Sequence, residues 1–261
     1  MQHTNPYPMW KASSAAQEAS AMVKISAIES TESSRAHIRR VFPTTIAASR
    51  DPFVLLDEFF VDESAGFPLH LHRGFEAVTY IIDGTLRHTD NLGNHDTIGS
   101  GGVHFFCAGS GICHAEMPVG KGVCHGLQLW INLPPELKKV HPSYQRVESN
   151  GIPEERPPGG VLRHILGGPS PIEVKTDVHF EDVHINADSS CEILMPESHD
   201  GFVYVYEGTA YILDITLEPG TGLVLERGER HTIWCNTRTR MVVISGMPLG
   251  RPITMHDGVV D

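Results

Sequence analysis

Short apolar runs broken by turn residues recur along the whole chain. Six of them are rich in β-branched or aromatic residues, as β-strands are; they lie at residues 78–82, 102–106, 125–133, 201–206, 210–215 and 240–245. No stretch keeps the 3.6-residue apolar period of an amphipathic helix over three turns. Many short strands separated by turns predict an all-β fold, either a sandwich or a closed barrel.

A polar segment rich in Pro and Gly, residues 148–160, is predicted to be a linker between two halves of the chain. The halves resemble each other weakly: YIIDGT at residues 80–85 is similar to YVYEGT at residues 204–209, an offset of 124 residues. Two copies of one barrel are the simplest explanation. We therefore predict a flexible arm, a first barrel domain and a second barrel domain, at residues 1–24, 25–147 and 161–261.

The composition narrows the function classes. The net charge of −12 argues against a nucleic-acid surface, which needs clustered Lys and Arg, and against an anionic membrane. No apolar run reaches the roughly 18 residues of a membrane span, and the first residues lack a secretory-signal pattern. The five cysteines are odd in number and form no CxxC motif, which favours a reducing compartment. We predict a cytoplasmic protein, with the nucleus as the alternative in a eukaryote.

The 16 histidines prompt a search for metal ligands. His70 and His72 form one i, i+2 pair, and His114 and Glu116 form a second pair later in the first half. Side chains at i and i+2 of a strand point to the same face, so two facing pairs would bring three imidazoles and one carboxylate together. That donor set suits a divalent ion and leaves positions for water or substrate. Glu76 has the same parity as His70 and His72, and parity alone leaves open whether it also faces the ion.

Other side chains near these pairs are expected to have secondary roles. Four histidines have no partner at ligand spacing and are expected at the surface or beside the ligands: His88, His95, His104 and His125. Five phenylalanines gather around the first pair, and we expect most of them in the core, with cavity lining as the alternative: Phe53, Phe59, Phe60, Phe67 and Phe75.

The second half does not repeat the ligand set. At the offset of 124 residues, Leu194 and Pro196 stand in place of the first histidine pair, and neither residue type binds metal. His231 stands in place of His114, but Ile233 replaces the carboxylate. We therefore expect a structural second barrel, with His231 as an ordinary strand or loop histidine.

Longer motifs around the two pairs resemble those of the pirin family, which are bicupins of the cupin superfamily. The motifs are HLHRGFE at residues 70–76, HAEM at 114–117, DPFVLLDEFF at 51–60, HGLQLWINLP at 125–134 and PSYQ at 142–145. The resemblance covers about residues 50–146 closely and is weak beyond. It implies two tandem cupin domains, which are jelly-roll β-barrels, with a metal site in the N-terminal one alone.

The same resemblance implies the ligand set and the cofactor. The matching ligands are His70, His72, His114 and Glu116, which favours Glu116 over Glu76. The expected cofactor is one divalent ion per chain, with iron first. A site of three histidines and one glutamate also accepts Ni, Mn, Cu, Co or Zn.

Three function classes follow. Some pirins are similar to quercetinases, which open the central ring of flavonols with O₂. The chain would then be a metal-dependent dioxygenase acting on a small aromatic substrate and O₂, with Glu116 also accepting the hydroxyl proton. Some eukaryotic pirins are iron-dependent partners of transcription factors, which implies a non-enzymic regulator with a protein partner. A metal-binding bicupin without turnover is the third class. We favour the dioxygenase.

Overall fold

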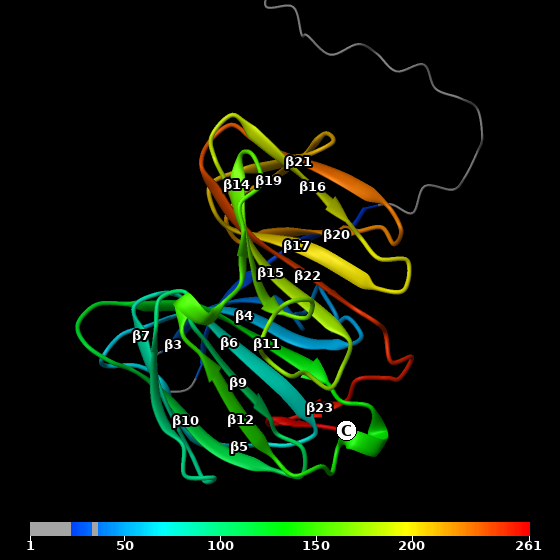
Figure 1. Cartoon of the computed structure of the whole chain (residues 1–261). Coiled ribbons are helices and arrows are strands. Elements are labelled where there is room, and N and C mark those ends of the chain that lie inside the picture. The colour runs from blue at the N-terminus through cyan, green and yellow to red at the C-terminus, as the bar shows by residue number, and fades with distance from the viewer. Residues whose placement is uncertain (1–21, 33–35) are drawn as a thin grey trace, which may run out of the picture.

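The computed structural model describes residues 22–32 and 36–261 (Figure 1). Within these ranges the chain forms strands and two short 3₁₀ helices, Pro135–Leu137 and Ser149–Gly151. The predicted arm falls mostly outside the described residues. No helix in the described ranges is long and apolar enough to cross a membrane. Five of the six apolar runs found in the sequence coincide with single strands, and the run at residues 210–215 spans the turn between Ala210–Ile212 and Ile215–Leu217, which confirms the all-β prediction.

The first barrel consists of a seven-stranded sheet and a four-stranded sheet. The larger sheet has the order β12 (Ser143–Val147), β9 (Val103–Cys107), β6 (Phe75–Asp83), β11 (Cys124–Asn132), β4 (Phe53–Val61), β3 (Ala36–Phe42) and β2 (Ile28–Glu32). The smaller sheet has the order β5 (Phe67–His72), β10 (Ile112–Pro118), β7 (Thr85–Asp90) and β8 (His95–Gly99). All of the pairings are antiparallel. Along each strand, successive side chains alternate between the two faces of the sheet, one of which faces the barrel interior.

The second barrel repeats this arrangement. Its larger sheet has the order β1 (Lys24–Ser26), β20 (Thr221–Leu225), β17 (Asp200–Glu207), β22 (Thr239–Gly246), β15 (Val178–Ile185), β14 (Gly160–Leu166) and β13 (Glu154–Glu155). Its smaller sheet has the order β16 (Ser189–Leu194), β21 (Arg230–Cys235), β18 (Ala210–Ile212) and β19 (Ile215–Leu217). β1 comes from the start of the chain yet pairs with β20 of the second barrel. The weak sequence repeat therefore reflects two barrels of equal strand order, whereas the proposed domain limits stay a prediction.

The two barrels meet through an apolar core. Phe202 of β17 makes edge contacts with Phe42 and Phe53 of the first barrel, at ring-centroid distances of 5.5 and 5.9 Å. These rings belong to a buried cluster with residues from both larger sheets. The interior of the second barrel holds one apolar cluster, whereas the first barrel has two separate clusters. In the first barrel, the buried polar side chains of the predicted metal site share the interior with these two apolar clusters.

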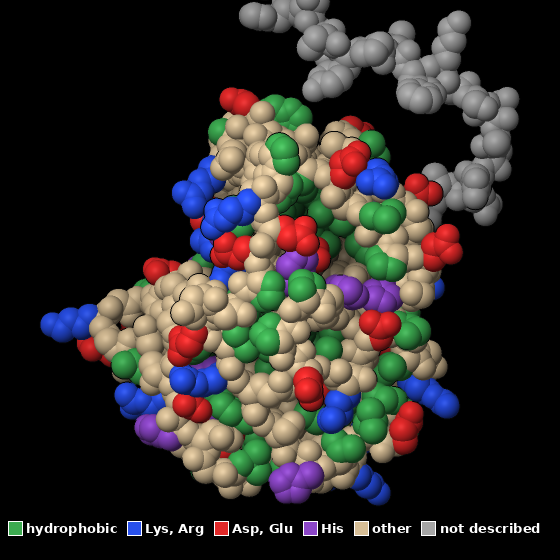
Figure 2. All heavy atoms as spheres, viewed as in Figure 1, with side chains coloured by type: hydrophobic (Ala, Val, Ile, Leu, Met, Phe, Trp, Pro, Cys, Tyr) green, Lys and Arg blue, Asp and Glu red, His purple; other side chains and the backbone are tan. Residues whose placement is uncertain are grey.

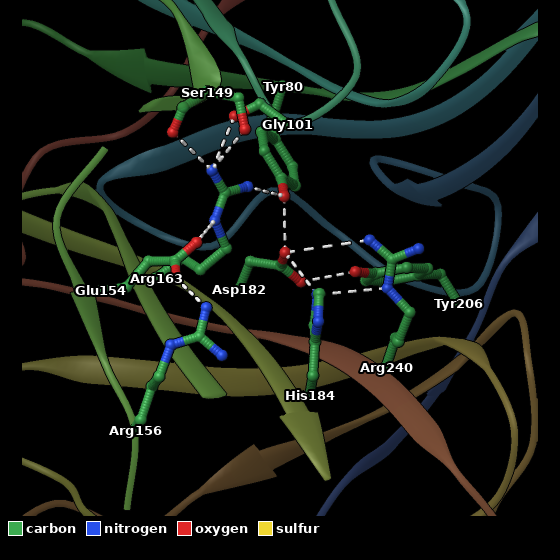
Figure 3. Close-up of polar contacts among 10 residues, drawn as sticks. All are labelled: Tyr80, Gly101, Ser149, Glu154, Arg156, Arg163, Asp182, His184, Tyr206 and Arg240. Carbon is green, nitrogen blue, oxygen red and sulfur yellow. Dashed lines mark hydrogen bonds and ion pairs between the residues drawn. The ribbon is translucent and has the colours of Figure 1, made fainter. Parts of the chain in front are cut away.

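Two buried carboxylates are shared across the boundary between the barrels. Asp182 of β15 accepts a hydrogen bond from the Tyr80 hydroxyl of the first barrel at 2.5 Å, and Arg163 donates to the same hydroxyl at 2.8 Å (Figure 3). In the opposite direction, Glu58 of β4 accepts from the Tyr204 hydroxyl of the second barrel at 2.7 Å. Each barrel therefore satisfies a buried charge of the other.

On the face drawn in Figure 2, the described Lys and Arg side chains lie interspersed with Asp and Glu side chains. This face carries no large basic surface of the kind that binds nucleic acid.

Candidate metal centre

The predicted histidines meet on two paired strands of the smaller first sheet. β5 and β10 run antiparallel, and His70 lies directly opposite His114. The Nε2 atoms of His70 and His72 are 2.8 Å apart, so both rings point at one place. The ring centroid of His114 is 4.5 Å from that of His70 and 4.9 Å from that of His72. The alternation of side chains along each strand thus brings the three imidazoles together.

Among the described residues, two overlapping groups could hold a metal ion. Ligand atoms of His70, His72 and His114 lie within 4.8 Å of one another. The same holds for His88, His114 and Glu116. His114 belongs to both groups, and Glu116 groups with His88 rather than with the histidine pair of β5. The four predicted ligands therefore line one interior but do not form one group of four.

Glu116 is held in place by side chains of the larger sheet. Its carboxylate accepts hydrogen bonds from Thr79 Oγ1 at 3.0 Å and from Gln128 Nε2 at 2.7 Å. Gln128 Oε1 in turn accepts from the indole N–H of Trp130 at 2.9 Å. Burial raises the pKa of Glu116, while the facing His88 and the hydrogen bond from Thr79 act in the opposite direction. The side chain has a fixed orientation in the barrel interior.

The buried imidazoles are suited to metal binding. Burial, with a further contribution from His70, lowers the pKa of His72 to about 3. Burial and the neighbouring His72 and His70 hold the pKa of His114 well below its usual range. Neutral imidazoles are the form that binds metal. In addition, Nε2 of His114 is buried without a hydrogen-bond partner among the described residues, and a metal ion would satisfy it. The donor set therefore fits a divalent ion.

Of the two places expected for His88, the surface and a position beside the ligands, the structure has the second: His88 is fully buried and belongs to one of the two groups. It lies opposite Glu116 on the neighbouring strand β7, and its Nδ1 is 3.5 Å from Nδ1 of His114. Its Nε2 is 3.0 Å from the carboxylate of Asp90, at i+2 on the same strand. The i, i+2 spacing of His88 and Asp90 was the signal in the sequence.

A cavity of about 530 Å³ opens beside the ligands. His70, His72 and Glu116 form part of its wall. Much of the remaining wall is apolar and includes Leu55, Phe59, Phe67, Leu71, Trp130 and Met255. Elsewhere in the wall, Arg40 donates two hydrogen bonds to the Asp57 carboxylate, at 2.9 and 2.7 Å. The cavity thus combines a ligand group, an apolar surface and a polar patch.

Comparison with known proteins identifies the family. A family model described as Pirin matches residues 35–131, and one described as Pirin C-terminal cupin domain matches residues 180–260. A pirin-like protein of Caulobacter vibrioides is 36% identical over 231 residues, which are 84% of this chain and 84% of that protein. The chain belongs to the pirin family. The predicted pair of cupin domains is thereby confirmed.

Other similar proteins include a human pirin and a named dioxygenase. The human pirin is 33% identical, with 87% of this chain and 82% of that protein covered. The crystal structure of a quercetin 2,3-dioxygenase from Acinetobacter baumannii matches with a TM-score of 0.83 at 27% identity, covering 91% of this chain and 90% of that chain. The resemblance thus extends over both barrels.

Glu76 does not lie with the ligand groups but is hydrogen-bonded to the backbone of another segment. Its buried carboxylate accepts hydrogen bonds from the backbone N–H groups of Lys175, at 3.1 Å, and Thr176, at 3.3 Å. Burial raises its pKa to about 7, although these hydrogen bonds act in the opposite direction. Glu76 belongs to neither ligand group of the described residues. Its carboxylate instead connects the first barrel to the segment before β15.

The second cupin barrel offers no comparable group in the part of the chain that the structure describes. His231 lies on β21, and its Nε2 is 3.3 Å from the carbonyl oxygen of Glu226. Ile233 is fully buried in the apolar cluster of this barrel. Apolar side chains therefore fill the interior of the second barrel, where the first barrel has its ligand groups.

Of the five phenylalanines around the first motif, Phe59 and Phe67 line the cavity. Phe53 lies in the core between the barrels, and Phe75 stacks on Trp130 at 4.2 Å. Phe60 stacks on His125 at 4.4 Å. Both expected roles, core packing and cavity lining, are therefore present.

Proposed function

We propose that this pirin is a metal-dependent dioxygenase that acts on flavonol-type aromatic substrates. The observation that carries the proposal is the cavity of about 530 Å³, which joins the ligand groups to an apolar wall. The similarity to a solved quercetin 2,3-dioxygenase over both barrels supports the same reaction class. The cytoplasm as its compartment stays a prediction.

The proposed ligands are His70, His72, His114 and Glu116, which would hold one divalent ion per chain, with iron first. An ion with four protein ligands keeps two positions of a six-coordinate shell for substrate and O₂. The ion would supply Lewis-acid and redox chemistry at those positions. His88 contacts the Asp90 carboxylate through Nε2 and faces His114 with Nδ1, so it would orient the His114 ring.

The cavity wall suits a flat aromatic molecule that carries hydroxyl groups. Phe59, Phe67 and Trp130 offer ring faces and edges for stacking or edge contacts. The ion pair of Arg40 and Asp57 offers donors and acceptors for hydroxyl groups farther along the substrate. Flavonols present both features.

Glu116 is the proposed proton acceptor. Its carboxylate lies in the cavity wall, and Thr79 and Gln128 each donate one hydrogen bond to it. A carboxylate oxygen can accept more than one hydrogen bond, so the oxygen that does not bind the ion can still receive a proton. We infer that Thr79 and Gln128 hold Glu116 toward the substrate hydroxyl, which loses its proton to the carboxylate.

The test is oxygen uptake and loss of visible absorbance with quercetin, for the chain loaded in turn with Fe, Ni, Mn, Cu and Co. We expect turnover with at least one redox-active ion. Glu116→Gln should slow turnover about 100-fold or more and weaken metal binding far less, because an amide cannot take the proton. Glu192→Gln, at an exposed glutamate of the second barrel, is the matched control and should leave turnover unchanged.

The absence of oxygen uptake with all five ions would overturn the dioxygenase proposal. It would favour a regulator whose affinity for a protein partner changes with the oxidation state of the ion. Uptake that is unchanged in Glu116→Gln would overturn the role of the carboxylate as base and leave the dioxygenase proposal standing.

A further inference from the structure

After the last strand of the second barrel, the chain returns to the first barrel and forms a hairpin there. After β22 the chain continues to β23 (Met255–His256) and β24 (Val259–Val260), which Figure 1 shows against the first barrel, beside the end marked C. Asp257 and Gly258 form the two-residue turn between these strands, with φ values of 44° and 82°. Positive φ at both positions is the geometry of a type I′ hairpin turn, which an Asp-Gly pair favours.

Backbone hydrogen bonds fix this hairpin beside the end of β5. The backbone N–H of Arg73 donates to the carbonyl oxygen of Gly258 at 3.1 Å, and that of Val260 donates to the carbonyl oxygen of Arg73 at 2.9 Å. The Lys138 ammonium donates to the carbonyl oxygen of Val260 at 3.0 Å. The Val260 side chain is buried in a cluster with Phe75. The hairpin is therefore part of the packed first barrel.

The turn of the hairpin contacts a proposed metal ligand. The carbonyl oxygen of Gly258 accepts a hydrogen bond from Nδ1 of His72 at 3.2 Å. In the same way, the carbonyl oxygen of Pro68 accepts from Nδ1 of His70 at 2.6 Å. Both rings consequently direct Nε2 at the same place, where these atoms are 2.8 Å apart. Metal-binding histidines commonly donate their other ring N–H to a carbonyl in this manner, which fixes the ring and its tautomer.

Glycine is required at position 258 for two reasons. Its φ of 82° is in the left-handed region that other residues adopt only with strain. A Cβ atom there would lie 2.7 Å from Nδ1 of His72 and 2.7 Å from the carbonyl oxygen of Leu71. Any side chain would therefore displace either the His72 ring or the hairpin.

We propose that the 255–260 hairpin completes the metal site, with the Gly258 carbonyl as the positioning group for the His72 ring. The inference rests on the proposed ligand set. Met255, Asp257 and Gly258 also line the cavity, so the hairpin forms a wall of the substrate space. In this way a segment that follows the second barrel contributes to the chemistry of the first barrel.

The test compares Gly258→Ala with Gly250→Ala. Gly250 also has a positive φ, 67°, but nothing lies within 4 Å of a Cβ atom at that position, so this variant controls for backbone strain. Co(II) affinity is measured by competition with a chelator, and the visible spectrum of the Co(II) form reports the ligand geometry. We expect Gly258→Ala to bind Co(II) at least about tenfold more weakly and to change the spectrum. Gly250→Ala should match the unaltered chain in both measurements.

A second measurement uses the unaltered chain and does not depend on the folding of a variant. If the hairpin supports metal binding, metal binding must by reciprocity stabilise the hairpin. Hydrogen exchange at the amides of Arg73 and Val260 should slow on Co(II) loading, whereas exchange at Ile212 in the β18–β19 hairpin should not change. Unchanged exchange at Arg73 and Val260 overturns the proposal.

The outcome also separates the hairpin from the ligand set. If His114→Ala loses Co(II) and a folded Gly258→Ala keeps full affinity and an unchanged spectrum, the role of the hairpin is wrong and the ligand set stands. If His114→Ala keeps Co(II) at full affinity, the ligand set itself is wrong.

Discussion

His114 is the side chain on which both candidate ligand groups depend. It is fully buried, and its Nε2 has no hydrogen-bond partner among the described residues. We expect His114→Ala to lose tight binding of a divalent ion and to keep its β-rich circular dichroism spectrum, because two barrels with their own cores do not fold around the metal as a zinc finger does. Elemental analysis and chelator competition measure the first effect.

His88 either binds the ion itself or orients the ligand His114, and variants distinguish these two roles. If His88 orients His114, His88→Ala should still bind one ion per chain, with affinity about 10–100-fold lower, as for other residues beside metal ligands. Glu116→Ala, which removes the proposed ligand altogether, should then lose more affinity than His88→Ala. The reverse order, with loss of the ion in His88→Ala and full affinity in Glu116→Ala, would make His88 the fourth ligand.

At the scale of strands, alternation and register had different predictive power. The i, i+2 spacing on each strand sufficed to place His70 with His72 and His114 with Glu116 on shared faces. The same rule applied to His88 and Asp90, but their strand lies beside β10 only through a register that no local pattern encodes. Likewise Asp257-Gly258 is a turn signal in the sequence, yet its contact with His72 depends on a hydrogen-bonded bridge between Arg73 and Val259.

The interior of the second barrel leads to a prediction of stoichiometry. Ile193 and Ile233 belong to its apolar cluster, and among the described residues no ligand group forms there. We therefore expect one tightly held divalent ion per chain by elemental analysis. His231→Ala should leave the metal content unchanged. Reproducible values near two, falling to one in His231→Ala, would show that the second barrel binds metal.

At the scale of the whole molecule, the two barrels exchange polar partners in a reciprocal way. Each buried carboxylate, Glu58 or Asp182, accepts from a tyrosine of the other barrel. The tyrosines and the carboxylates are separated by the same offset of 124 residues that the sequence repeat showed, as are two arginines beside them: Glu58 and Asp182, Tyr80 and Tyr204, Arg39 and Arg163. The sequence predicted the two barrels through this offset, but not that the tyrosine of each barrel would donate to the carboxylate of the other.

This exchange and the shared apolar core predict that the barrels unfold together. Tyr80→Phe removes one hydrogen bond from the buried Asp182 carboxylate and one from Arg163, which both keep other partners, and should cost about 1–3 kcal/mol. For a chain of this size that lowers the Tm by about 2–4 °C per kcal/mol. Tyr204→Phe should have a similar effect through Glu58, whereas Tyr211→Phe, at a more exposed hydroxyl, should change stability by less than about 0.5 kcal/mol.

Calorimetry at pH 7 tests the prediction. Hydrogen bonds from His184, Tyr206 and Tyr80 outweigh the effect of burial and lower the pKa of Asp182. The pKa of Asp182 in the folded state lies below the unfolded value of about 3.9. The contribution of its ionised carboxylate to the folding stability is therefore fully present at pH 7 and is lost as the pH falls through the folded pKa. We expect one transition, which Tyr80→Phe and Tyr204→Phe both move to lower temperature. Two transitions, of which each variant moves only one, would mean that the barrels are independent despite their shared core.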